Sequence, residues 1–113
     1  MGDDTFDSDM AALRKEFQDV TVERMADLGR AMESLAAAPS PAVRLTVLGE
    51  LESIAHKLGG SGALFGFPEL GDAAQAFELA CQTAQSGAAG DDGAVRRAWT
   101  ALEQAAGLEK GGP

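Results

Sequence analysis

Apolar residues recur at spacings of three and four along most of this chain, which is the period of an amphipathic helix. A first stripe runs over Met10, Leu13, Phe17 and Val20, and a second over Val22, Met25, Leu28, Met32 and Leu35. The second stripe is displaced by one or two positions, whereas a straight helix would keep a single stripe. We therefore predict a short first helix, a break or kink near residues 19–22, and a longer helix after it.

Proline and glycine positions divide the rest of the chain into three further helices. Pro41 suits the first turn of one helix, with Ser40 as its N-cap, and Pro68 opens another after a glycine-containing turn. Asp91 or Asp92 is placed to cap the last helix. The predicted core positions of these three helices are Val47, Leu51, Ile54 and Leu58, then Leu70, Ala73, Ala74, Phe77, Cys81 and Ala84, and finally Val95, Trp99, Leu102 and Ala106.

These elements predict an all-α protein, an up-down four-helix bundle with a short additional N-terminal helix. The composition agrees, because 45% of the residues are hydrophobic, only 5% are aromatic and tyrosine is absent, whereas sheets favour β-branched and aromatic residues. A chain of 113 residues has room for one domain. We expect a disordered acidic lead over residues 1–8, one helical domain over 9–108 and a flexible tail over 109–113.

Charge and cysteine content exclude several classes of function. Eighteen acidic and nine basic residues leave a net charge of -9, which argues against binding to nucleic acid or to an anionic membrane. No apolar run approaches the roughly 20 residues of a membrane span, and the acidic N-terminus does not resemble a signal peptide. A single cysteine and a single histidine support neither an internal disulfide nor a common zinc site. We expect a cytoplasmic protein without a metal site.

The single histidine, His56, is predicted to point into solvent. At about 100° per residue, the core positions Val47, Leu51, Ile54 and Leu58 cluster within about 60° of one another, and His56 lies about 170° from their centre. The positions that share its face are Gly49, Glu52, Ser53, Gly59, Gly60 and Ala63.

Almost all of these neighbours are small, although a glycine inside a helix costs about 0.8–1 kcal/mol relative to alanine. Gly59 and Gly60 either end the helix as a cap or leave room for another protein beside the imidazole. We favour the second interpretation, because no polar stop follows and a Gly66-Phe67-Pro68 turn comes a few residues later.

Phosphorylation of a ring nitrogen is the chemistry that best suits an isolated, exposed histidine. A Ser-His-Asp arrangement needs a cleft and an oxyanion site, metal binding needs more ligands than Glu52 alone, and the GxxxxGK phosphate loop is absent. A nucleophilic imidazole that accepts a phosphoryl group needs only to be neutral and accessible, because the partner can supply the remaining machinery.

Residues 55–66, with the sequence AHKLGGSGALFG, resemble the signature of histidine-containing phosphotransfer (HPt) domains. Leu70, Ala73-Ala74 and Phe77-Glu78 resemble the next helix of that family, and Phe65-Gly66-Phe67 is similar to the phosphotransfer domain at the start of chemotaxis-type kinases. The resemblance implies a four-helix bundle that accepts a phosphoryl group on His56. Gly60 is then the small residue that makes space for the partner, and Gly66 is the turn glycine.

The resemblance also implies the partners. Donor and acceptor would be aspartates of response-regulator receiver domains, whose bound Mg²⁺ assists the transfer, in a relay that includes a hybrid or histidine kinase. The chain has no ATP-binding segment, so we expect a phosphorylated carrier protein and not an enzyme, without a cofactor of its own and acting as a monomer.

One position departs from the family pattern, which has a lysine where this chain has Gly59. Lys57 follows the histidine directly, about 100° away on a helix, and its long stem makes it a phosphate neighbour together with Gly59 and Gly60. The expected docking residues are Ser53, Ser61, Ala63 and Leu64.

Three other interpretations stay open at this point: a phosphotransfer domain of a chemotaxis-type kinase, a docking module that binds a receiver without being phosphorylated, and a helical scaffold. Between Ser53 and Pro68 the only charged residue besides the histidine is Lys57. The sequence therefore predicts a nearly neutral surface around His56, where a phosphate-bearing partner meets little repulsion.

Overall fold

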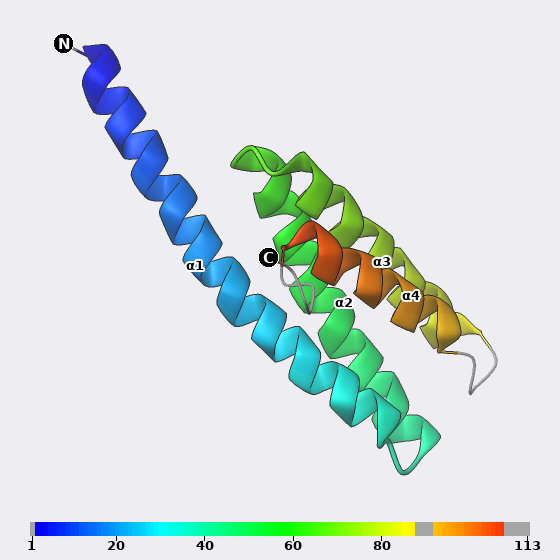
Figure 1. Ribbon diagram of the computed structural model, residues 1–113. Coiled ribbons are helices and arrows are strands. Elements are labelled where there is room, and N and C mark those ends of the chain that lie inside the picture. The colour runs from blue at the N-terminus through cyan, green and yellow to red at the C-terminus, as the bar shows by residue number, and fades with distance from the viewer. Residues whose placement is uncertain (1, 88–91, 108–113) are drawn as a thin grey trace.

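The computed structural model describes residues 2–87 and 92–107, which form four α-helices in up-down order (Figure 1). The helices are α1 (Gly2–Ala36), α2 (Pro41–Leu64), α3 (Pro68–Ser86) and α4 (Gly93–Ala105). The described residues contain no strand, so the all-α class is confirmed. They also contain no separate short helix before the bundle, because that segment belongs to α1.

Helix α1 is continuous, and the predicted break near residues 19–22 is wrong. Thr21 is buried between Phe17 and Met25, and its hydroxyl donates a hydrogen bond of 2.7 Å to the Phe17 carbonyl. Because this bond satisfies the hydroxyl, a polar residue occupies a core position and joins the two apolar stripes into one. Val22, which we assigned to the second stripe, is 58% exposed.

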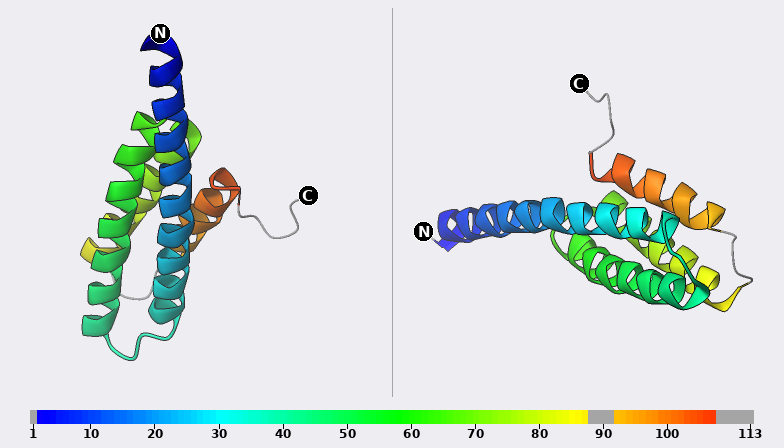
Figure 2. Two further views of the ribbon diagram at one scale, coloured as in Figure 1. Left: turned by 90° about the vertical axis from the view of Figure 1, so that its left-hand side faces the viewer. Right: turned by 90° about the horizontal axis from the view of Figure 1, so that it is seen from below.

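The N-terminal part of α1 extends beyond the other helices (Figures 1 and 2). Its 35 residues correspond to about 52 Å at 1.5 Å per residue, against about 36 Å for the 24 residues of α2. Residues 2–8 are helical and not the disordered lead that we predicted. The predicted tail, 109–113, lies outside the described residues.

The beginnings of α2 and α3 follow the predicted local signals. The Ser40 hydroxyl accepts a hydrogen bond of 3.2 Å from the Val43 amide, and Pro41 occupies the first turn of α2. Pro68 does the same in α3. The turn before it contains Gly66 at a φ of +85°, a left-handed conformation that favours glycine.

The core runs along facing sides of the helices and includes nearly all the predicted apolar positions on α2, α3 and α4, with Leu48 and Ala55 in addition. Phe17 packs against Phe65 and Phe67, with ring centroids 5.6 and 5.3 Å apart, so the turn between α2 and α3 is held against α1. Cys81 is fully buried, and this burial raises the pKa of its thiol to about 12.

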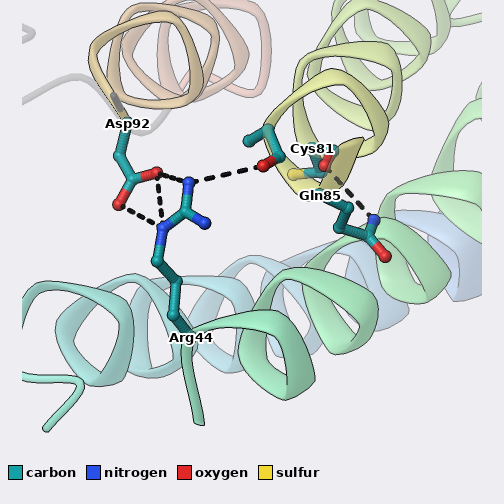
Figure 3. Close-up of polar contacts among 5 residues, drawn as sticks. Arg44, Cys81, Gln85 and Asp92 are labelled. Carbon is teal, nitrogen blue, oxygen red and sulfur yellow. Dashed lines mark hydrogen bonds and ion pairs between the residues drawn. The ribbon is translucent and has the colours of Figure 1, made fainter. Parts of the chain in front are cut away.

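A buried ion pair joins three helices at the other end of the bundle (Figure 3). Arg44, in the first turns of α2, donates to both carboxylate oxygens of Asp92, the shortest distance being 2.6 Å from Nη2 to Oδ1. It also donates to the Ala84 carbonyl on α3 at 3.4 Å. Asp92 precedes α4 but makes no side-chain cap, because its carboxylate binds Arg44. The alternative cap, Asp91, lies outside the described residues.

Candidate functional site

His56 lies in the middle of α2 on the face opposite the core. Its side chain is 75% exposed, whereas its neighbours Ala55 and Leu58 are fully buried. The predicted exposure is therefore confirmed. Because His56 lies inside a helix and not on a loop, its imidazole is attached to a rigid element.

A carboxylate from the neighbouring helix holds one of the two ring nitrogens. Nδ1 of His56 is 3.0 Å from Oε2 of Glu78 on α3, and the Glu78 side chain is only 19% exposed. An ionised carboxylate only accepts hydrogen bonds, so this contact favours the tautomer with the proton on Nδ1. The other nitrogen, Nε2, then keeps its lone pair.

The ring stands in a shallow groove of about 430 Å³ between α2 and α3. The groove is lined by Gly49, Glu52, Ser53, His56, Lys57 and Glu78. Glu52 is held there by two amides of α3, with Gln82 Nε2 at 2.8 Å and Gln85 Nε2 at 2.7 Å from its two oxygens. The hydrogen bonds from Gln85 and Gln82 lower the pKa of the Glu52 carboxyl, so it stays ionised near neutral pH.

The two adjacent glycines, Gly59 and Gly60, have different surroundings. A Cβ on Gly60 would meet nothing within 4 Å, so this position leaves open space beside the imidazole. A Cβ on Gly59 would lie 3.2 Å from Cγ of Gln75 and 3.5 Å from the carbonyl of Gly71. Gly59 is buried against α3, and our assignment of it to the accessible face of His56 is a misplacement.

The predicted docking residues do not form one surface. Ser53, Ala63 and Leu64 are exposed, and the 74% exposed Leu64 is the largest apolar group among them. Ser61 lies elsewhere, since it lines a hollow against α1 that includes Leu13. The helical period explains the difference, because five residues separate Ser61 from His56 and rotate it by about 140°.

Sequence reasoning missed Glu78 as a partner of the imidazole. The available signal was the polar spacing on α3, where Glu78, Gln82 and Gln85 follow one another at intervals of four and three and so share a face. The prediction of a nearly neutral surface around His56 is also wrong, since Glu52 and Glu78 both line the groove.

The sequence is similar to one known protein family. Residues 12–107 match the family model described as Hpt domain. The chain belongs to the Hpt domain family. No curated protein and no solved structure matches the sequence significantly. Hpt domains are phosphocarrier modules that act in histidine phosphotransfer, and they interact with receiver domains and kinases in phosphorelays.

Two further properties of this Hpt domain concern its described residues alone. None of their helices is long and apolar enough to cross a bilayer. Nor do their histidine, cysteine and carboxylate side chains gather in any group of three or more that suits a metal ion.

Proposed function

We propose that this Hpt domain carries a phosphoryl group on Nε2 of His56. In this proposal it takes the group from the aspartyl phosphate of one receiver domain and delivers it to the aspartate of another. The observation that supports this most directly is the contact between His56 Nδ1 and Glu78, in a ring that is otherwise exposed. One nitrogen is occupied by the protein, and the other is free to react.

The transfer needs no group from this chain beyond the ring and its carboxylate. The Nε2 lone pair attacks phosphorus, the bond between phosphorus and the aspartate oxygen breaks, and its electron pair stays on the leaving carboxylate. The ring gains positive charge while Nδ1 keeps its proton, and the Glu78 carboxylate at 3.0 Å compensates that charge. Delivery to a second receiver is the same step in reverse, with Mg²⁺ belonging to the receiver.

The exposed side of α2 next to the ring is the proposed docking surface. Gly60 offers no side chain, and a Cβ built there would meet nothing within 4 Å, so a receiver can approach the helix closely. Leu64 supplies an exposed apolar group at the end of α2, a little over two turns after His56. Lys57 lines the groove with His56, where its ammonium is available to a phosphate.

The test is transfer of label from a phosphorylated receiver domain to purified wild-type protein. We expect acid-labile, alkali-stable labelling of the wild type and none of His56→Gln. Glu50→Gln is the matched control, because Glu50 is exposed on the same helix but does not line the groove. Equal labelling of His56→Gln would contradict the proposal. A wild type that binds the receiver but stays unlabelled would instead indicate a docking module.

A further inference from the structure

Two carboxylates line the groove around His56, but only one of them contacts the imidazole ring. Glu78 contacts the imidazole directly and accounts for one carboxylate. Glu52 is the second, and it forms no hydrogen bond with His56, since its oxygens accept from Gln82 and Gln85. Lys57 is the only cation that lines the groove among the described residues.

Glu52 is also fixed in position, unlike an ordinary surface glutamate. A free glutamate side chain samples many rotamers and can turn away from a second negative charge. Here such a movement breaks two hydrogen bonds to amides on α3, of 2.8 and 2.7 Å. Glu52 lies four residues before His56, which places the two on one face of α2 about 6 Å apart along the axis.

We propose that Glu52 is a fixed negative charge that destabilises phosphorylated His56 and thereby favours delivery of the phosphoryl group to a receiver. This inference rests on the proposed function. Phosphorylation adds up to two negative charges beside a carboxylate that two hydrogen bonds hold in place, whereas the unphosphorylated ring carries no negative charge. The repulsion therefore acts on the phosphorylated form alone. It shifts the equilibrium towards free His56 and phosphorylated receiver.

The expected size follows from Coulomb's law. One charge acting on a phosphoryl group a helical turn away, in a partly exposed and salt-screened groove, changes an equilibrium constant by roughly three- to tenfold. Glu50, on the same helix but outside the groove, is farther away and more screened. Its removal changes the net charge equally but is expected to alter the equilibrium less than about twofold.

The experiment measures the phosphotransfer equilibrium with one receiver domain. Wild type, Glu52→Gln and Glu50→Gln are each mixed with the phosphorylated receiver, and phosphate on both proteins is quantified once the ratio is constant. Because an equilibrium constant between free species does not depend on how tightly the proteins dock, a change in affinity alone does not move it. We expect Glu52→Gln to shift the equilibrium constant three- to tenfold towards phosphorylated His56, with a smaller effect at 1 M salt.

Two outcomes separate the possible failures. If wild type is phosphorylated but Glu52→Gln gives the same equilibrium as Glu50→Gln, the role of Glu52 is overturned while the proposed function stands. If wild type takes no phosphoryl group at all, the proposed function is wrong and this inference with it. Glu52→Ala removes the same charge without adding an amide, and a shift in the opposite direction from Glu52→Gln would also overturn the role.

Discussion

His56 is exposed, yet its ring is held by a hydrogen bond to Glu78. An exposed side chain ordinarily samples several rotamers, and ordering it at the moment of reaction costs conformational entropy. The hydrogen bond from Nδ1 to the largely buried Glu78 restricts the ring before the partner arrives. In the proposed transfer, this contact also selects Nε2 as the nucleophilic nitrogen. At the scale of the residue, one contact between two helices thus orients the ring.

Replacing Glu78 with glutamine tests this contact. The amide oxygen can still accept the Nδ1 proton, but the hydrogen bond loses its charged partner, which is worth about 1–1.5 kcal/mol more than a neutral one. We expect initial phosphorylation of His56 to slow about tenfold, measured at a saturating concentration of phosphorylated receiver. Asp72→Asn is the control, because Asp72 is exposed on the same helix. Equal rates for the two variants would contradict the role of Glu78.

Glu52 makes a second prediction, on stability against pH. Hydrogen bonds from Gln85 and Gln82 place its pKa in the folded protein below the ordinary value of 4.5. A depressed carboxyl pKa stabilises the fold above the unfolded pKa, and this contribution is lost as the pH falls through the folded pKa. We expect the wild type to lose more stability than Glu52→Gln between about pH 6 and pH 3. Urea unfolding at both pH values measures it, and parallel losses would refute it.

At the scale of elements, some glycines of α2 allow close packing against α3, and another leaves the surface beside His56 accessible. A Cβ on Gly62 would lie 3.0 Å from the backbone nitrogen of Gly71, and one on Gly71 would lie 3.1 Å from the Gly59 carbonyl. Such contacts are tighter than nine in ten of those that real Cβ atoms make, so these three glycines let α2 and α3 cross at short range. The crossing brings Glu78 of α3 within reach of His56.

Two alanine substitutions separate packing from access. Gly60→Ala adds a methyl group in open space and removes a helix-interior glycine, so we expect it to stabilise the protein by about 0.5–1 kcal/mol. Gly62→Ala forces α2 and α3 apart and is expected to destabilise it by about 1–3 kcal/mol. Chemical denaturation measures both free energies. If Gly62→Ala proved as stable as Gly60→Ala, the close crossing would not be a constraint.

At the scale of the whole molecule, Arg44 and Asp92 hold the bundle together at the end where α2 begins. Their side chains are only 11% and 12% exposed, and the pair connects α2 to the start of α4 while Arg44 also reaches α3 (Figure 3). Phe17 performs the corresponding function at the other end, where it packs against the turn between α2 and α3. The site lies between these two anchors.

Breaking the ion pair from one side is expected to be more harmful than removing both partners. Arg44→Met leaves the Asp92 carboxylate buried without a cation, which costs about 3–5 kcal/mol. The double variant Arg44→Met, Asp92→Leu replaces the pair with apolar groups and is expected to recover most of that loss, because Asp92 makes no side-chain cap. A double-mutant cycle by urea unfolding measures the coupling. Additive losses would show that the pair contributes no coupling.

Local sequence patterns were sufficient to predict most boundaries of the helices that follow α1. Ser40 with Pro41, and Pro68 after Gly66, act on their own backbone and need no distant partner. The predicted break in α1 was wrong because Thr21, a polar residue, occupies a core position, where its hydroxyl bonds within its own helix. The burial of Arg44 gave no comparable local signal, since its partners Ala84 and Asp92 are 40 and 48 residues away.

The sequence by itself determined that the chain is helical, that His56 faces away from the core, and that the surrounding motif resembles an HPt signature. These properties depend on helical period and short motifs, both of which are local. Only the tertiary structure decided that Gly59 faces α3, that Glu78 holds Nδ1, and that Glu52 adds a fixed charge beside the ring. Each of these depends on how closely α2 and α3 cross, which the helical period of either helix alone does not specify.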